Sequence, residues 1–304
     1  MRVLRLPRSG AVCLLAAGLL CAAAPGWAQS DLENVLRQYG EETVKGYVRP
    51  LVDVFSANLH AGLYHSASLG GLKPQCELSI VAMGSLVGDG QESYTARAPE
   101  GFQPATFRTA TVFGGRGTQI THAANPGLKY RGSDGIIEAT LFPLAVPQLA
   151  VSYLGTEALV RFMRTPNLGD DAFPETTLFG LGLRHSISRY IPAAPVDVAA
   201  GVFYNAFTMG DIVDFRGLAL GVQASRGFGP LSAYGGVAWE QGTMNLQYAT
   251  DNPYSRERVD VDIDGDNSFR LTLGGRLSLA LLRLFADVNV GAVTNFSSGI
   301  GLGS

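Results

Sequence analysis

Alternation of apolar and polar residues over segments of about ten residues is the feature that most limits the possible folds of this chain. Residues 269–280 carry Phe, Leu and Gly on one parity and Arg, Thr, Gly and Ser on the other. After a slip near Leu281, the same period of two continues over residues 282–292. A period of two predicts β-strands with one apolar face. It does not decide whether protein or lipid covers that face.

Strands of this kind follow one another along most of the chain. Ten segments are predicted as strands: 76–87, 147–153, 156–164, 177–187, 196–208, 215–227, 231–248, 258–280, 282–293 and 296–303. Many have the length of roughly 9–11 residues that a tilted strand needs to cross a bilayer. Strands of soluble proteins average about 5–6 residues.

The sequence therefore predicts an all-β fold, a transmembrane antiparallel β-barrel. We expect ten to twelve strands, with fourteen as a further option. A soluble β-sandwich with its charges facing solvent is the alternative. The barrel explains together the long strands, the apolar face and an opposite face that is polar and rich in glycine.

Charged residues on the polar parity would line the lumen of such a barrel and set its selectivity. The candidates are Arg161, Arg184, Asp197, Glu240, Arg270, Arg276, Arg283 and Asp287.

The first 28 residues have the pattern of a secretory signal peptide. Three arginines precede the apolar run 11–24, and a cut after Ala28 would leave small residues at the required positions. After residue 28, no stretch approaches the roughly 18 apolar residues of a membrane-spanning helix. Cys76 is then the single cysteine, so no internal disulfide is expected. Export without such a helix favours the bacterial outer membrane.

Connections alternate in length along the chain. Short ones lie at Gly155, 227–230 and 280–282, and longer polar ones at 165–176 and 249–257. If the carboxyl end faces the periplasm, all three short turns fall on the periplasmic side, as in known barrels. The stretch 88–146 would be a long outer segment, or would add a hairpin formed by 106–113 and 135–142.

Residues 29–60 form the one segment with a clear helical period. Its apolar positions are Val44, Tyr47, Val48, Leu51, Val52, Phe55 and Leu59. Pro50 would start a second helical piece or kink the first. An amphipathic segment directly before a barrel would plug its lumen or lie at the periplasmic membrane surface. The predicted division is 1–28 signal peptide, 29–60 helical segment and 61–304 barrel.

Few residues point to chemistry. Acidic residues in 259–267 resemble a calcium loop, but Leu271 occupies the position that needs Glu. We interpret them instead as part of a strand paired with 240–248. Neither His spacing nor a G-x-S-x-G motif indicates a metal or an active site, so no catalytic residue, metal or cofactor is expected. His185 beside Ser186 leaves a lipid-modifying barrel enzyme as a third-ranked alternative.

Several segments resemble a bacterial family of outer-membrane barrel proteins known as a domain of unknown function. They are YVRPLVDVFSANLHAGLYHSA (47–67), FPLAVPQ (142–148), GTEALVRFMR (155–164) and LFGLGLRHSISRYIP…PVDVAAGVFYN (178–205), of which Gly180–Pro192 is the most specific. The resemblance implies an outer-membrane barrel. A more distant likeness is to long-chain fatty acid transporters, although their Asn-Pro-Asn-Ala type motif is absent from 29–60 and the last residue is Ser304 rather than an aromatic.

The function that we expect is passive or gated transport of small hydrophobic or amphipathic solutes. A structural or adhesive protein whose outer loops bind a partner is the alternative. Expected partners are outer-membrane lipid, the barrel-assembly machinery and a small hydrophobic solute. The net charge of −3, with no basic run after Arg8, argues against nucleic acid.

Overall fold

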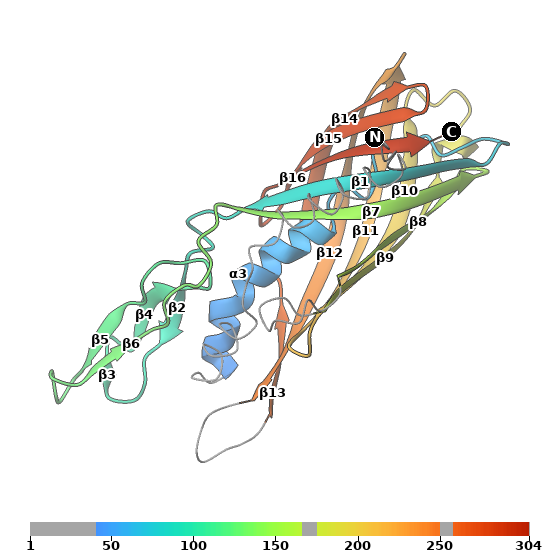
Figure 1. Ribbon diagram of the computed structural model, residues 1–304. Helices are drawn as coiled ribbons and strands as arrows, with labels where there is room; N and C mark the ends of the chain where they lie inside the picture. Colours follow the sequence, from blue (N-terminus) through green and yellow to red (C-terminus); the bar gives the residue numbers. More distant parts are fainter. Residues whose placement is uncertain (1–40, 166–174, 250–257, 304) are drawn as a thin grey trace, which may run out of the picture.

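A computed structural model describes residues 41–165, 175–249 and 258–303. Its main element is an antiparallel sheet that closes on itself through pairing of β11 with β12. The strands are β1 (Gln75–Leu86), β7 (Leu141–Tyr153), β8 (Thr156–Thr165), β9 (Thr176–Ser186), β10 (Asp197–Met209), β11 (Val213–Phe228), β12 (Leu231–Ala249), β13 (Arg258–Asp264), β14 (Phe269–Leu279), β15 (Leu282–Val290) and β16 (Asn295–Gly303). Figure 1 shows them side by side around the ring.

The ring is a ten-strand barrel, because β13 and β14 both pair with β12 and act as one interrupted strand. The prediction of an antiparallel barrel with an N-terminal helix is confirmed, at the lower predicted strand number. The options of twelve and fourteen strands are wrong. The predicted hairpin of 106–113 with 135–142 therefore adds no strands to the barrel. Thr106–Ala110 pairs instead with Ser93–Arg97 in a separate small sheet, and the amides of Ile136 and Ile137 donate to the backbone oxygen of Val112.

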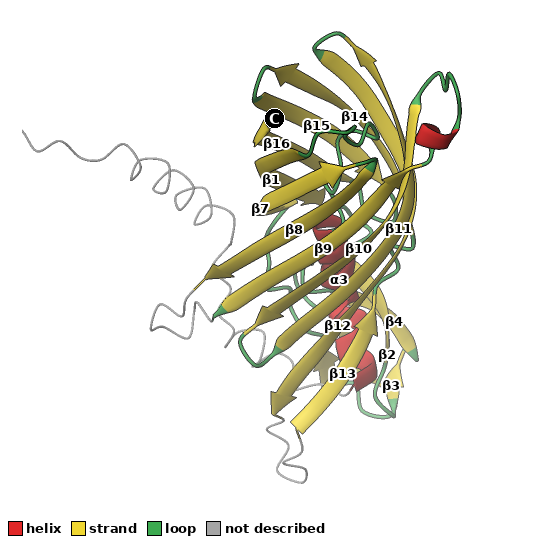
Figure 2. Ribbon diagram, turned by 90° about the vertical axis from the view of Figure 1, so that its right-hand side faces the viewer, coloured by secondary structure: helices red, strands yellow, loops and turns green. Residues whose placement is uncertain are grey.

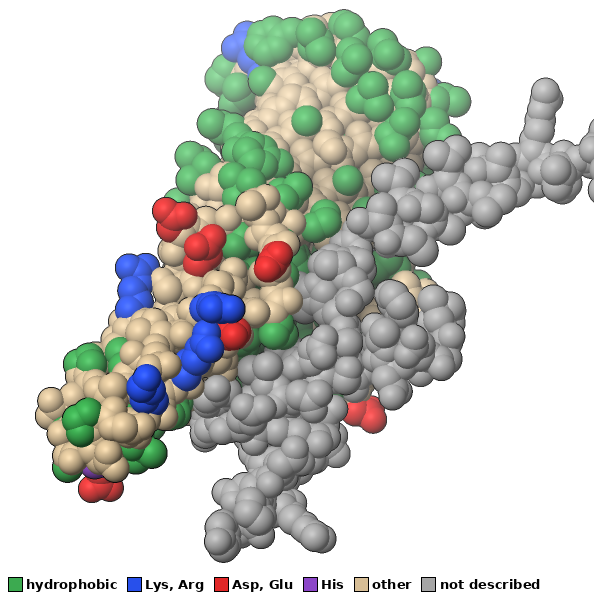
Figure 3. All heavy atoms as spheres, turned by 60° about the vertical axis from the view of Figure 1, so that its left-hand side comes forward, with side chains coloured by type: hydrophobic (Ala, Val, Ile, Leu, Met, Phe, Trp, Pro, Cys, Tyr) green, Lys and Arg blue, Asp and Glu red, His purple; other side chains and the backbone are tan. Residues whose placement is uncertain are grey.

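Side chains of the barrel are arranged inside out relative to a soluble protein. Along β9, Leu181 and Leu183 face outward and are 49% and 53% exposed. Arg184, on the opposite parity, faces inward and is 3% exposed. The same outward apolar positions include Leu78, Ile80, Val160, Phe162, Leu218, Leu220, Val222, Leu273 and Ile300. On the face shown in Figure 3, most of the coloured side chains on the barrel are hydrophobic, and the charged ones gather towards the arm. A soluble sandwich would bury this parity, so that alternative is wrong.

The two ends of the barrel differ in their connections. One end, here called the short-turn end, holds the start of β1, the end of β16 and the turns at 154–155, 229–230 and 280–281. It also holds the middle-length connection 187–196 with the short helix η1 (Ser188–Tyr190). The opposite, long-loop end holds the link from β1 to β7. The three predicted short turns do share one end; the loops 165–176 and 249–257 lie mostly outside the described residues.

An arm of residues 88–140 leaves the barrel at the long-loop end (Figure 1). It contains β2 (Ser93–Arg97) paired with β4 (Thr106–Ala110), and a second sheet of β3 (Phe102–Gln103), β5 (Gln119–His122) and β6 (Lys129–Arg131). Ala96, Phe107 and Ile120 form a small core between the two sheets. The backbone of Val87 bonds to Thr140, which closes the base of the arm.

Helix α3 (Glu41–Leu59) begins beside the arm and runs into the barrel (Figures 1 and 2). It is a single helix that continues through Pro50, so the option of a second helical piece is wrong. No helix within the described residues is long and apolar enough to cross a membrane. The predicted signal peptide 1–28 and residues 29–40 lie outside the described residues.

A plug held by the polar wall of the lumen as the candidate functional site

Helix α3 and the chain that follows it fill the lumen. We call residues 41–71 the plug. The helix buries Val48, Val52 and Val54 completely, and His60 and Ala61 beyond it are also buried. The chain then reaches the short-turn end, where Gly70 and Gly71 accept hydrogen bonds from the amides of the turn at 154–155. The plug therefore contacts the inner wall from one end of the barrel to the other.

Arg161 on β8 binds the plug just after the helix ends. Its guanidinium donates to the backbone oxygens of Leu59 (3.0 Å) and Ala61 (2.8 Å). A third hydrogen bond of 2.7 Å goes to the side-chain oxygen of Gln148 on β7. Arg161 is 1% exposed, so its donors depend on these acceptors in place of water. The last carbonyls of a helix lack partners within the helix, which makes them ready acceptors.

Arg270 on β14 makes an equivalent contact one turn earlier. It donates to the backbone oxygen of Ala57 at 2.9 Å and forms an ion pair of 2.9 Å with Glu240 on β12. Asn267 donates to the same carboxylate at 2.8 Å. The buried charge of Glu240 thus has two donors on the wall, and Arg270 links it to the plug.

Arg184 on β9 is the third arginine that binds the plug. It donates to the backbone oxygen of Ser66 (2.8 Å) and to Gln223 (2.9 Å), and it is paired with Glu157 on the adjacent strand β8. Its guanidinium also lies 5.8 Å from the ring centre of Tyr64, a cation–π distance. Three arginines of the wall therefore bind four backbone oxygens of the plug.

Glycines of the inner face make room for the plug. A Cβ at Gly217 would lie 2.7 Å from the His60 ring, and one at Gly242 would lie 2.6 Å from the Ser56 hydroxyl. These distances are shorter than any ordinary contact. The sequence showed the inner face to be rich in glycine, and at these two positions the plug is the physical reason. At Gly182 and Gly299 the space is instead filled by phenylalanine rings of the wall, Phe203 and Phe285.

Towards the long-loop end, aromatic packing and an amide network hold the helix. Phe55 lies against Phe207 and Phe215, at ring-centre distances of 4.5 and 5.3 Å. Asn58 donates to the backbone oxygen of Phe142 at 2.8 Å and accepts hydrogen bonds from Ser85 and Asn295. Asn58 is fully buried, so these partners replace water.

Asp53 is the carboxylate of the helix that approaches the interrupted strand β13–β14. It accepts a hydrogen bond of 2.6 Å from the amide of Asp266. Burial raises the pKa of Asp53 to about 6, and the nearby charge of Asp266 adds to this effect. Arg49, which lies 4.0 Å from Asp266, acts in the opposite direction.

The structure places all eight predicted lining residues on the lumen side of their strands. Arg161, Arg184, Arg270 and Glu240 belong to the plug contacts described above. Asp287 accepts a hydrogen bond from Tyr234 at 2.8 Å. Arg276 pairs with Glu77 at 3.1 Å, Arg283 lies near it, and Asp197 lies at the rim.

Sequence reasoning missed the partners of these charges. Glu77 and Glu157 both contribute to ion pairs, and Gln148 and Gln223 accept from arginine. Glu157 was detectable, because it lies on the polar parity of its strand. The backbone oxygens of the plug were not detectable, since every residue type carries one.

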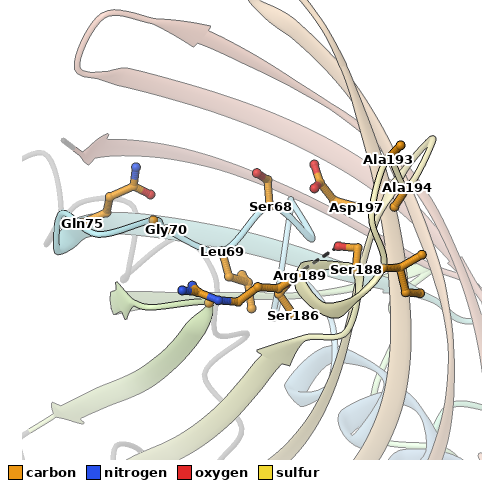
Figure 4. Close-up of a pocket in the computed structure, with 13 residues that line it drawn as sticks. Ser68, Leu69, Gly70, Gln75, Ser186, Ser188, Arg189, Ala193, Ala194 and Asp197 are labelled. Carbon is orange, nitrogen blue, oxygen red and sulfur yellow. Dashed lines mark hydrogen bonds between the residues drawn. The ribbon is translucent and has the colours of Figure 1, made fainter.

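A hollow of about 520 Å³ lies at the short-turn end, between the plug and the connection from β9 to β10 (Figure 4). Ser68, Gly70 and Gln75 line one side, and Ser188, Arg189 and Asp197 line the other. His185, whose proximity to Ser186 suggested an enzyme, bonds to Thr156 and Tyr190 at 2.8 Å each.

The acidic segment 259–267 lies on the extension that was expected. Asp260 and Asp262 occupy β13, which pairs with residues 243–249 of β12. Among the described residues, no group of three or more His, Cys, Asp or Glu side chains could hold a metal ion.

Comparison with solved structures returns barrels of transport proteins at very low similarity. The toluene transporter TbuX of Ralstonia pickettii is 9% identical, with 79% of this chain and 91% of that chain covered and a TM-score of 0.26. A triple mutant of the Rhodopseudomonas blastica porin is 13% identical, with 76% and 100% covered and a TM-score of 0.16. A BenF-like porin from Pseudomonas fluorescens Pf-5 is 7% identical, with 76% and 98% covered and a TM-score of 0.17. Similarity this low does not extend to function.

No curated protein matches the chain. A protein family does, over residues 8–304, and its description agrees with the resemblance drawn from the sequence. Because the match spans nearly the whole sequence, the chain belongs to the family of unknown function DUF6588.

Proposed function

We propose that this protein is an outer-membrane barrel that passes a small amphipathic solute when its plug moves. The observation that carries the proposal is the hydrogen bonding of Arg161, Arg184 and Arg270 to backbone oxygens of the plug. The apolar outer belt supports a position in lipid, with membrane lipid and the assembly machinery as partners.

The chemistry of the contacts supports a movable plug. Hydrogen bonds from wall to plug can be exchanged for hydrogen bonds to water at a small net cost of about 1–3 kcal/mol each. Around Arg161 and Arg184, the plug uses such polar contacts. Ring contacts hold the plug at both levels, with Phe55 against Phe207 and His65 against Phe285.

The size of the ring supports passage once the plug is displaced. Eight strands already give an interior that side chains just fill, and the diameter grows with strand number. A ten-strand ring without its plug would leave a water-filled lumen lined by the arginines and carboxylates described above. The mixed lining of the 520 Å³ hollow, with Ile191 and Ala194 beside Ser188 and Arg189, favours an amphipathic solute.

Deletion of residues 31–56 tests whether the plug blocks passage. In planar bilayers, we expect the shortened protein to conduct more than the full chain, because the lumen loses most of its helix. Unchanged conductance, with heat-modifiable gel mobility showing a folded barrel, would contradict a blocking plug.

A reversible tether tests whether the plug must move. The variant Ser56→Cys with Gly242→Cys, in a Cys76→Ser background, joins α3 to β12 at a point of direct contact. Solute uptake into liposomes should stop on oxidation and return on reduction. The Cys76→Ser chain is the matched control, and uptake that is indifferent to the tether would rule out movement of this part of the plug.

The arm supports a second candidate, a protein that binds a partner with its outer segments. The arm leaves the barrel at the long-loop end and contacts the helix, since Tyr47 donates to the backbone oxygen of Asp134. Replacing residues 89–138 by a short glycine linker between Gly88 and Ala139 should abolish partner-dependent cell adhesion. Adhesion that survives this change would remove the candidate.

A further inference from the structure

Two adjoining hollows lie at the short-turn end. The outer one, of about 520 Å³, is open to solvent, and an inner one of about 50 Å³ lies beside it. Ser68 and Gln75 line both hollows. The two hollows are therefore neighbours, and Figure 4 shows the outer one.

The inner hollow carries more positive than negative side chains. Three arginines, Arg184, Arg276 and Arg283, face two glutamates, Glu77 and Glu157. Arg184 is paired with Glu157 and Arg276 with Glu77. Arg283 donates to backbone oxygens of Ala280 and Leu282 and forms no ion pair within the described part of the chain. One positive charge is thus left without a carboxylate.

Three buried polar atoms at this hollow also lack hydrogen-bond partners among the described residues. They are Nε of Arg276, Nδ1 of His65 and Oε1 of Glu77. The other ring nitrogen of His65 lies 2.8 Å from Glu77. A buried donor without an acceptor is costly, so Nε of Arg276 marks a place where an oxygen acceptor would be stabilised.

Part of the lining of the outer hollow is apolar. Leu69, Ile191 and Ala193 line it, and its volume is within the range of small-molecule sites. We propose that the two hollows bind a small amphipathic carboxylate, with its carboxylate beside Arg276 and Arg283 and its apolar body in the outer hollow. This rests on the proposed function and names the class of solute.

The site also touches the contacts of the plug. Arg184 lines the inner hollow and donates to the backbone oxygen of Ser66 in the plug. A bound carboxylate competes for this guanidinium, which gives the solute a direct means of loosening the plug at the short-turn end.

Hexanoate is the probe, with hexan-1-ol and hexylammonium as ligands of matched length. Binding to the full chain in detergent is measured by saturation-transfer NMR and calorimetry. We expect hexanoate to bind at least about tenfold more tightly than hexan-1-ol, and hexylammonium not to bind. Arg283→Gln should weaken hexanoate about tenfold, while the exposed Arg216→Gln should leave it unchanged.

Equal affinity for hexanoate and hexan-1-ol would overturn the proposal, as would unchanged binding in a folded Arg283→Gln variant. If that variant does not fold, the comparison of the three ligands with the unaltered chain still decides. Failure of the proposed function has a different result: hexanoate binds, but the tether between residues 56 and 242 leaves uptake unaffected.

Discussion

At the scale of single residues, the buried arginines of the wall bind the plug and do not line an open pore. Arg161, Arg184 and Arg270, which were predicted as lining residues, are buried on the inner side of their strands. Their nearest acceptors, however, include backbone oxygens of residues 57–66. A guanidinium offers five donors in a fixed plane, so it can bind the wall and the plug together. This explains why arginine rather than lysine occupies these buried positions.

Arg161→Met is the sharpest test of this view. Met fills similar space but leaves the oxygens of Leu59 and Ala61 without donors, at a cost of roughly 3 kcal/mol or more for docking of the plug. Hydrogen exchange of amides 57–63 should accelerate and bilayer conductance should rise. Arg216→Met, at an exposed ion pair, is the control. Native exchange rates in Arg161→Met would show that the wall arginine does not hold the plug.

A glycine offers a test that leaves every charge in place. Valine at Gly217 on β11 would collide with the His60 ring, whereas valine at Gly227 on the same strand meets open space. We expect Gly217→Val to displace the plug and raise conductance, and Gly227→Val to behave as the unaltered chain. The idea that inner glycines accommodate the plug fails if both variants conduct alike.

At the scale of elements, helix α3 should respond to pH through Asp53. The docked pKa of about 6 exceeds the ordinary value of 3.8. At Asp53 the docked state therefore binds more protons between about pH 4 and 6, so the contribution of Asp53 to docking falls as pH rises through this window. The difference of about two units corresponds to roughly 3 kcal/mol. His60 in the plug acts in the opposite direction, because burial lowers its pKa to about 3 and docking then favours the neutral ring.

Asp53→Asn removes the titrating group while keeping an oxygen for the amide of Asp266. Hydrogen exchange of the helix, followed from pH 4 to 7 and corrected for intrinsic rates, should then accelerate less with rising pH than in the unaltered chain. Asp214→Asn, at the exposed pair with Arg216, should give the pH profile of the unaltered chain. If Asp53→Asn also gives that profile, the effect belongs to another group.

The strands also show where sequence reasoning succeeds and where it stops. Alternation located ten strands because a lipid-facing wall needs every second residue apolar. It missed the first half of β7, where Pro143 and Pro147 argue against a strand. In the structure, residues 141–147 pair with β1 alone among the described strands, so the prolines occupy a free edge. It also missed the break at 265–268, which depends on the distant Asp53.

At the scale of the whole molecule, the fold inverts the usual distribution of polarity and then fills its own interior. The helix supplies a second apolar core within a polar ring, around Phe55 and Phe215. The sequence left two positions open for this helix because its stripe fits a lumen and a membrane surface equally. Contacts between residues far apart in the chain, such as Arg270 with Ala57, decide the matter and leave no local pattern.

If lipid surrounds the barrel, the cost of an outward-facing arginine should depend on its depth in the bilayer. Leu220, 46% exposed in the middle of β11, should face hydrocarbon, so Leu220→Arg should lower the free energy of unfolding in vesicles by about 2–4 kcal/mol. Leu281→Arg, in the short turn between β14 and β15, should cost roughly 0–1 kcal/mol, because the arginine there reaches the headgroups. Denaturant titration in phospholipid vesicles measures both. Equal costs would mean that hydrocarbon does not cover the middle of the barrel, because a depth-dependent penalty is the signature of a bilayer and of no aqueous or protein surface.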